Sequence, residues 1–157
     1  MSASLDGKTV VVIGGATGIG YAVAEAARDE GAKVVIASSQ AANVEAAVAR
    51  LGGGARGEVV DVGDEASVAA FFDRLGPFDH LAFTAGDWGG SMFAATREVD
   101  LTKARDGFKV RFWGALAAVK HGSRTIREGG SFTFTGGMLA QRPMKGAPVT
   151  TAVAGAI

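Results

Sequence analysis

Short runs of consecutive apolar residues alternate along the chain with segments in which apolar residues recur every three or four positions. Continuous β-branched runs are typical of parallel strands that are covered on both faces. The recurring pattern is typical of amphipathic helices that bury one face. The expected strands are residues 8–13, 33–37, 57–62, 78–84 and 131–135, and the expected helices are residues 18–30, 43–51, 65–75, 101–121 and 149–157.

The alternation of strands and helices predicts an α/β fold. Parallel strands joined by right-handed helical crossovers give a doubly wound parallel sheet in a three-layer α/β/α arrangement. We expect the strand order 3-2-1-4-5, with a ligand-binding switch point between the first and fourth strands. A turn at Gly129 and Gly130 is expected to precede the fifth strand, and a polar loop is expected from residue 85 to residue 100. No linker interrupts the pattern, so residues 1–157 are interpreted as one domain.

Composition and charge narrow the functional classes. Sixteen basic and sixteen acidic residues cancel to a formal net charge of zero, which favours neither a nucleic-acid nor a membrane partner. The chain has no cysteine and two histidines, so disulfides, thiolate catalysis and a metal site are not expected. The sequence has no leader-like segment and no apolar run long enough to span a bilayer, so we expect a soluble cytoplasmic protein.

Candidate chemistry begins with the glycines between the first strand and the first helix. Gly14, Gly18 and Gly20 follow a G-x-x-x-G-x-G spacing. Glycine adopts positive φ without steric cost and lets a ligand approach the main chain closely. The N–H groups that open the next helix, together with its dipole, favour a bound phosphate. The turn therefore indicates a phosphate site, and an ordinary strand-to-helix connection is the alternative.

Three motifs in order resemble the short-chain dehydrogenase/reductase family. Residues 14–20 are similar to its T-G-x-x-x-G-I-G turn, with Ile13 in the threonine position. Asp61-Val62 resembles the family's acidic dipeptide after the third strand, and residues 84–86 resemble its N-A-G motif. The resemblance covers essentially the whole chain and implies a Rossmann-like fold. The cofactor-binding residues that it implies are Gly14, Ala16, Thr17, Gly18, Ile19, Gly20, Ser38, Ser39, Asp61, Val62, Thr84, Ala85 and Gly86.

The residues at two strand ends bear on how a dinucleotide would be recognised. Asp61 can accept a hydrogen bond from an adenine amino group, and Val62 offers an apolar edge. An acidic residue after the second strand would repel the 2′-phosphate of NADP, but this chain has Ser38 and Ser39 there. Both hydroxyls can donate to a phosphate oxygen, so we predict NADP(H) as the preferred cofactor. Two turn-forming serines without a ligand contact are the alternative.

The positions of the family's proton-transfer pair are altered in this chain. The resemblance implies a tyrosine near the start of the last helix and a lysine four residues later. The best register places Val149 and Val153 at these positions, and valine cannot transfer a proton. The single tyrosine, Tyr21, follows the glycine turn and is interpreted as a helix residue.

The two other catalytic positions of the family are also altered. The serine position falls on the glycines at 136 and 137, or on Thr135 after a one-residue shift, and Arg111 occupies the asparagine position. An arginine could stabilise a developing oxyanion in place of a tyrosine hydroxyl. Arg111 and Thr135 are therefore the candidate catalytic residues, with a snorkelling surface arginine as the alternative for Arg111.

The resemblance also implies that the chain is incomplete at its C-terminus, because relatives continue through further strands beyond residue 157. In this family the helix at 149–157 commonly packs against its twin, so we expect a homo-oligomer. The function implied is NADP(H)-dependent hydride transfer to or from a small carbonyl or alcohol substrate. The alternative is a catalytically inactive dinucleotide-binding sensor or oligomer scaffold, because fold does not carry function.

Overall fold

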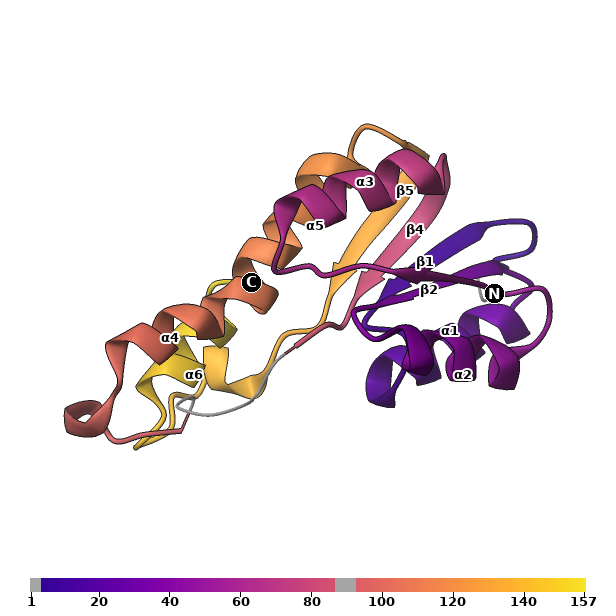
Figure 1. The fold of residues 1–157 in the computed structure, drawn as a ribbon. Helices are drawn as coiled ribbons and strands as arrows, with labels where there is room; N and C mark the ends of the chain where they lie inside the picture. Colours follow the sequence, from indigo (N-terminus) through magenta and orange to yellow (C-terminus); the bar gives the residue numbers. More distant parts are fainter. Residues whose placement is uncertain (1–3, 87–92) are drawn as a thin grey trace.

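The computed structural model, which describes residues 4–86 and 93–157, contains a five-stranded parallel sheet (Figure 1). The strand order is β3-β2-β1-β4-β5, which confirms the prediction. The strands are β1 (Thr9–Ile13), β2 (Lys33–Ser38), β3 (Arg56–Val59), β4 (Phe78–Phe83) and β5 (Ile126–Phe134).

Helices cover both faces of the sheet and make the expected three layers. Figure 1 shows α1 and α2 on one side of the sheet, α3 and α5 on the other, and α4 with α6 beyond them. The helices are α1 (Gly18–Asp29), α2 (Ala41–Leu51), α3 (Glu65–Leu75), α4 (Leu101–Phe108), α5 (Ala115–Gly122) and α6 (Pro148–Gly155). Short helical segments are η2 (Thr96–Glu98), the π-helical η3 (Lys109–Gly114) and η4 (Met138–Ala140).

The position of β1 in the centre of the sheet, between two helical layers, explains why its residues form a continuous apolar run. In β1, Val10 and Val12 pack toward the α1 and α2 layer, whereas Val11 and Ile13 pack toward α3 and α5. Successive side chains of a strand point to opposite faces, so a strand covered on both faces must be apolar at every position. Burial of these side chains on both faces fixes the sheet between the two helical layers.

The last strand is longer than the predicted residues 131–135. Three residues of β4, from Phe78 to His80, lie beside six residues of β5, from Ile126 to Ser131. The predicted turn at Gly129 and Gly130 is wrong, because both glycines lie within β5. Gly129 has a φ of 76°, a conformation that glycine adopts readily, so it permits this irregularity without breaking the strand.

Two other predicted elements need correction. The third strand is Arg56–Val59 rather than residues 57–62, although the Val60 N–H still donates to the Ser38 carbonyl at 3.0 Å. The predicted helix at 101–121 is divided by η3 into α4 and α5. Gly114 ends η3 where a Cβ would lie 2.8 Å from the Val62 carbonyl oxygen, so the helix approaches the sheet closely there.

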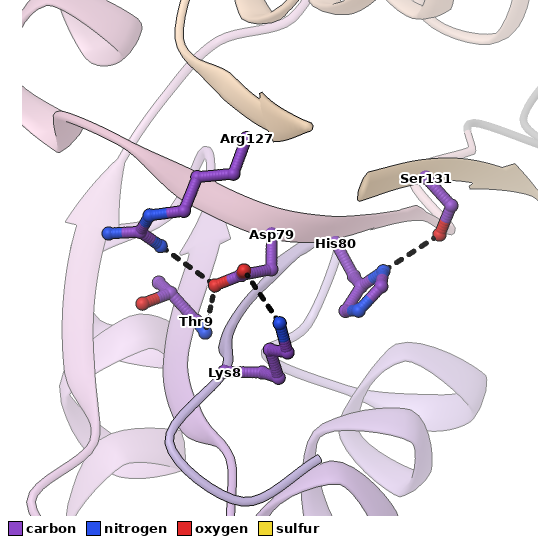
Figure 2. Close-up of polar contacts among 6 residues, drawn as sticks. All are labelled: Lys8, Thr9, Asp79, His80, Arg127 and Ser131. Carbon is purple, nitrogen blue, oxygen red and sulfur yellow. Dashed lines mark hydrogen bonds and ion pairs between the residues drawn. The ribbon is translucent and has the colours of Figure 1, made fainter. Parts of the chain in front are cut away.

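A buried carboxylate connects β1, β4 and β5 near their amino ends (Figure 2). Asp79 of β4 accepts hydrogen bonds from the Thr9 N–H at 2.8 Å and from Arg127 Nη1 at 2.7 Å, and Lys8 Nζ lies 3.4 Å away. The Thr9 N–H hydrogen bond, followed by the charges of Arg127 and Lys8, lowers the pKa of Asp79. This cluster lies at the amino ends of the strands, opposite the carboxyl ends where the predicted site lies.

Within residues 4–86 and 93–157, no helix combines the length and apolarity that crossing a membrane requires.

Candidate functional site

A cleft of about 640 Å³ follows the edge of the sheet where the five parallel strands end. Ligands of open α/β sheets bind at this edge. The cleft is lined by Ile13, Gly14, Thr17, Gly18, Ile19, Gly20, Ser38, Ser39, Val60, Asp61, Val62, Thr84, Ala85, Gly86, Val110, Arg111, Thr135 and Gly136. All the predicted cofactor residues except Ala16 line this cleft, and so do both candidate catalytic residues. Ala16 is buried instead in the apolar cluster of the α1 and α2 layer.

Two glycines of the turn after β1 allow close packing of the main chain. A Cβ on Gly14 would lie 2.5 Å from the Ala85 nitrogen, and a Cβ on Gly20 would overlap the Gly14 carbonyl oxygen. The Gly14 N–H donates to the Ala37 carbonyl at 2.8 Å, and Thr84 Oγ1 donates to the Ile13 carbonyl at 3.1 Å. These contacts join the turn to the ends of β2 and β4.

Gly18 has a different environment from the two packed glycines. It has a φ of 54°, and nothing lies within 4 Å of the position that a Cβ would take. Gly18 is also the first residue of α1, and the side chain of the N-cap residue Thr17 makes no capping hydrogen bond. The main chain here therefore faces open space beside the positive end of a 12-residue helix. This arrangement fits a phosphate group.

The end of the cleft at β2 and β3 presents polar side chains. Asp61 is exposed, its Oδ1 accepts the Gly63 N–H at 2.9 Å, and its own N–H donates to Ser67 Oγ at 3.0 Å. These bonds fix the main chain around the carboxylate. Ser38 is half-buried and Ser39 is exposed at the end of β2. The pair offers hydroxyls and no charge to a group bound beside them.

The end of the cleft at β4 and β5 contains a buried arginine. Arg111 of η3 is 5% exposed, and burial lowers its pKa. A Cβ on Gly86 would lie 2.8 Å from Arg111 Nε, so the guanidinium lies directly against that glycine. Thr135 lines the same end and its Oγ1 donates to the Phe83 carbonyl at 3.3 Å. A π-helical segment often marks a functional site.

Four lining residues were not among the predicted cofactor-binding or catalytic residues, although the sequence analysis placed Gly136 at the family's serine position and Ile13 at its threonine position. Ile13 and Val60 immediately precede predicted cofactor residues, so their position at strand ends was the available signal. Val110 precedes Arg111, and Gly136 follows Thr135. Residues 87–92 of the predicted loop lie outside the described residues. Within the described part of the chain, no three His, Cys, Asp or Glu side chains form a group that could hold a metal ion.

Known proteins share both the sequence pattern and this architecture. Residues 8–156 match the family model described as short chain dehydrogenase. The chain belongs to the short-chain dehydrogenase/reductase family. A short-chain dehydrogenase/reductase of Acremonium sp is 37% identical over 95% of this chain, and sorbitol dehydrogenase of Cereibacter sphaeroides is 35% identical over 80%. The chain spans 64% of the length of the first relative and 50% of the second.

Solved structures of this family superpose on the chain. A short-chain type dehydrogenase/reductase from Mycobacterium ulcerans, 25% identical, has a TM-score of 0.90 over 98% of this chain and 60% of its own. A small-chain dehydrogenase in complex with NADPH is 34% identical, with a TM-score of 0.77 over 96% of this chain and 60% of its own. The three-layer fold is therefore that of the short-chain dehydrogenase/reductase family.

The two residues that the sequence analysis placed at the family's tyrosine and lysine positions lie outside the cleft. Val149 and Val153 are buried on α6 and pack against Val99, Ala104 and Phe108. Neither valine lines the cleft. The face of α6 that would carry the proton-transfer pair therefore forms an apolar contact with α4.

The single tyrosine has a structural environment. Tyr21 is 3% exposed and packs with the α1 and α2 layer, and the Arg50 guanidinium lies 3.4 Å from the centroid of its ring. Tyr21 does not line the cleft, which agrees with its interpretation as a helix residue.

Proposed function

We propose that the cleft binds NADP(H) for hydride transfer between this cofactor and a small carbonyl or alcohol substrate. The observation that supports this proposal is the open main chain at Gly18, set at the start of α1 in a cleft that follows all five strand ends. A dinucleotide is long enough to need such a cleft, and its phosphates need unobstructed N–H donors. When bound, the cofactor supplies or accepts the hydride.

Each part of the cofactor has matching residues in this proposal. The N–H groups at the start of α1 bind the pyrophosphate beside Gly18. Asp61 accepts a hydrogen bond from the adenine amino group, and Val62 packs against the edge of the ring. Thr84, Ala85 and the adjacent Gly86 continue the cleft toward the nicotinamide.

The preference for NADP(H) over NAD(H) rests on Ser38 and Ser39. Their hydroxyls can donate to a 2′-phosphate, and no carboxylate at the end of β2 repels it. The NADPH complex of a 34% identical neighbour is consistent with this preference. Ser39→Asp should weaken NADPH binding by roughly tenfold or more through charge repulsion, and should leave NADH binding less affected. Ser123→Asp, which adds the same charge on an exposed turn outside the cleft, is the matched control.

Arg111 is the proposed electrophilic group of the reaction. Its guanidinium stabilises the negative charge that develops on the substrate oxygen during reduction, with Thr135 beside it. Removal of such a group typically costs roughly 100-fold to 1,000-fold in turnover. Arg111→Ala should therefore abolish measurable reductase activity, and unchanged turnover in this variant would exclude the role.

Binding without turnover is the second candidate function. The burial of Val149 and Val153 against α4 favours it, because the register of the family's proton-transfer pair carries no polar group. In this case the chain serves as a dinucleotide sensor or an oligomer scaffold.

One pair of experiments separates the two functions. NADPH and NADH are titrated into the protein, and a panel of carbonyl and alcohol substrates is then assayed by nicotinamide absorbance. Binding with turnover supports the oxidoreductase, whereas binding without turnover supports the sensor. Absence of binding contradicts both.

We also propose that the protein is a cytoplasmic homo-oligomer that acts without a nucleic-acid or membrane partner. Large apolar side chains are exposed along α4 and η3, among them Leu101 at 69% and Trp113 at 60%. Exposed apolar side chains gathered on one side of a protein are typical of protein–protein contacts.

A further inference from the structure

A lysine side chain lies beside the carboxylate at the end of the cleft formed by β2 and β3. Lys109 is the first residue of η3, and the next two residues, Val110 and Arg111, line the cleft. A Cβ on Gly63 would lie 2.8 Å from Cε of Lys109 and 3.2 Å from Oδ1 of Asp61. The lysine and the carboxylate therefore meet over Gly63, at the rim of the cleft.

The absence of a side chain at Gly63 allows this arrangement. Cδ and Cε of Lys109 pack where a Cβ of residue 63 would lie. The exposed ammonium group extends from this point, and within the described part of the chain it pairs with no carboxylate. The Gly63 N–H holds Asp61 through Oδ1, so Oδ2 can accept a hydrogen bond from a ligand. The rim of the cleft thus offers one anionic acceptor and one cationic donor side by side.

Adenine presents the complementary pair of groups. Its 6-amino group donates hydrogen bonds, and the ring nitrogens N1 and N7 on either side of that group accept them. A protein acceptor beside a protein donor therefore matches adenine. A 6-oxo purine would instead direct an oxygen acceptor at the Asp61 carboxylate, which cannot donate when it is ionised.

We propose that Lys109 is a second residue that recognises the adenine of the cofactor, by donating a hydrogen bond to the ring nitrogen beside the amino group that Asp61 binds. This inference rests on the proposed dinucleotide function. Hydrogen bonds from a charged donor are stronger than those between neutral groups. Asp61 and Lys109 together select the base, whereas Ser38 and Ser39 act on the 2′-phosphate.

Three nucleotides that differ by one ring atom test this contact. Adenosine 5′-monophosphate, its 1-deaza analogue and its 7-deaza analogue each compete with NADPH, whose displacement is followed by fluorescence. All three carry the same 5′-phosphate and lack a 2′-phosphate, so the ratio of their affinities reports on the ring nitrogens. We expect one analogue to bind roughly tenfold more weakly than adenosine 5′-monophosphate, the loss typical of one charge-assisted hydrogen bond. Equal affinities of the three nucleotides, or no competition with NADPH, would overturn the inference.

Variants at two positions assign this ratio to Lys109. Lys109→Met keeps an unbranched stem on Gly63 and removes the donor, so the weaker analogue should bind as tightly as adenosine 5′-monophosphate. Lys109→Arg keeps a charged donor and should retain part of the ratio. Gly63→Ala should reduce the ratio, because its Cβ displaces Cε of Lys109. Lys33→Met, the matched control, removes the same group from an exposed position at the amino end of β2 and should retain the full ratio.

The outcomes separate this inference from the proposed function. A full ratio in Lys109→Met would mean that another donor, such as a main-chain N–H, binds the ring nitrogen, and would contradict the role of Lys109. Equal nucleotide affinities in a protein that binds NADPH contradict the inference alone. Failure of the wild-type protein to bind NADPH contradicts the proposed function itself.

Discussion

The two ends of the cleft are built in different ways. At the end formed by β1, β2 and β3, main-chain groups and small residues make the surface, and Gly14, Gly18 and Gly20 decide its shape. At the end formed by β4 and β5, individual side chains decide the chemistry, above all Arg111 and Thr135. The sequence resemblance to the family rests mainly on motifs at the first end, whereas the residues predicted at the family's catalytic positions belong to the second end or lie outside the cleft.

Under the proposed function, the end that binds the cofactor and the end that reacts can therefore change independently. Cofactor binding by N–H groups tolerates many side chains as long as the glycines remain. Proton transfer depends on single groups, and here Val149 and Val153 occupy the expected positions and pack against α4. The family fold therefore supports a proposal for the cofactor more strongly than one for the reaction.

The largest expected effect comes from placing a lysine at the buried position where the family resemblance implies one. Val153 is 0% exposed, so Val153→Lys would bury an ammonium group among Val99, Ala104 and Phe108. A shift of several pKa units for a buried lysine corresponds to a loss of about 4 kcal/mol or more in unfolding free energy. Urea denaturation measures this loss, and Ala152→Lys, at the exposed neighbouring position, should change stability little. Equal stability of both variants would show that this face of α6 is not buried.

A pair of glycine variants separates folding from binding at the cofactor end. Gly14→Ala combines a φ of 86° with a Cβ 2.5 Å from the Ala85 nitrogen, so it should cost about 3 kcal/mol or more of unfolding free energy. Gly18→Ala meets no neighbour and should cost only about 1 to 2 kcal/mol, from its φ of 54°. Its Cβ nevertheless enters the phosphate site, so NADPH affinity should fall sharply. Thermal unfolding and NADPH titration of both variants check these outcomes, and unchanged NADPH affinity in Gly18→Ala would argue against the phosphate site.

Asp79 lies at the amino ends of the strands, on the side of the sheet away from the cleft. It connects the strands that form the two ends of the cleft, because it binds groups of both β1 and β5. Asp79→Asn should lower the unfolding free energy by about 1 to 3 kcal/mol at neutral pH, since charge-assisted hydrogen bonds are lost. The pKa of Asp79 is lowered in the folded protein. Its stabilising contribution is therefore present above the unfolded aspartate pKa of about 3.9, and is lost as the pH falls below that value through the folded pKa.

Denaturation at several pH values checks this linkage. The difference between the wild type and Asp79→Asn should shrink as the pH falls through this acidic range. Asp73→Asn, an exposed carboxylate on α3, should show no comparable difference. A difference between wild type and Asp79→Asn that is independent of pH would mean that the charge of Asp79 does not stabilise the fold.

The smallest effect on stability is expected at the apolar surface of α4 and η3. Trp113 is 60% exposed, so Trp113→Ser should change the unfolding free energy by only about 0.5 kcal/mol. The same variant should weaken self-association, measured by sedimentation equilibrium, if this surface forms the homo-oligomer contact. Ile19→Ser, which removes an exposed apolar residue from the cleft, should leave the association state unchanged.

Most strands and the turn before α1 could be predicted because their signals are local, and the strand order followed from the doubly wound topology. Apolar runs mark β1, β2 and β4, and the glycine spacing marks the turn before α1. The first residues of β5 were missed because Arg127, Glu128 and Gly129 carry no apolar pattern, and their pairing is set by contacts with β4. The division of the helix at η3 was missed for the same reason, since the close approach of Gly114 to Val62 is a tertiary contact.

The reacting end could be predicted only in part. The resemblance to the family gave Arg111 and Thr135 as candidates, but the burial of Arg111 against Gly86 depends on how η3 meets the end of β4. The sequence register placed Val149 and Val153 at catalytic positions, but it could not predict that α6 packs against α4 through these residues. Ala16 belongs to a matching motif, yet its side chain packs into the core because α1 lies against the sheet there.

Titration of NADPH into wild-type protein and Gly18→Ala, followed by fluorescence, tests the proposed cofactor site most directly. The cleft geometry predicts saturable binding to the wild type with a single class of site, weaker binding of NADH, and a large loss of NADPH affinity in Gly18→Ala. Absence of saturable binding to the folded wild type, or equal NADPH affinity in the two proteins, would contradict the assignment of this cleft.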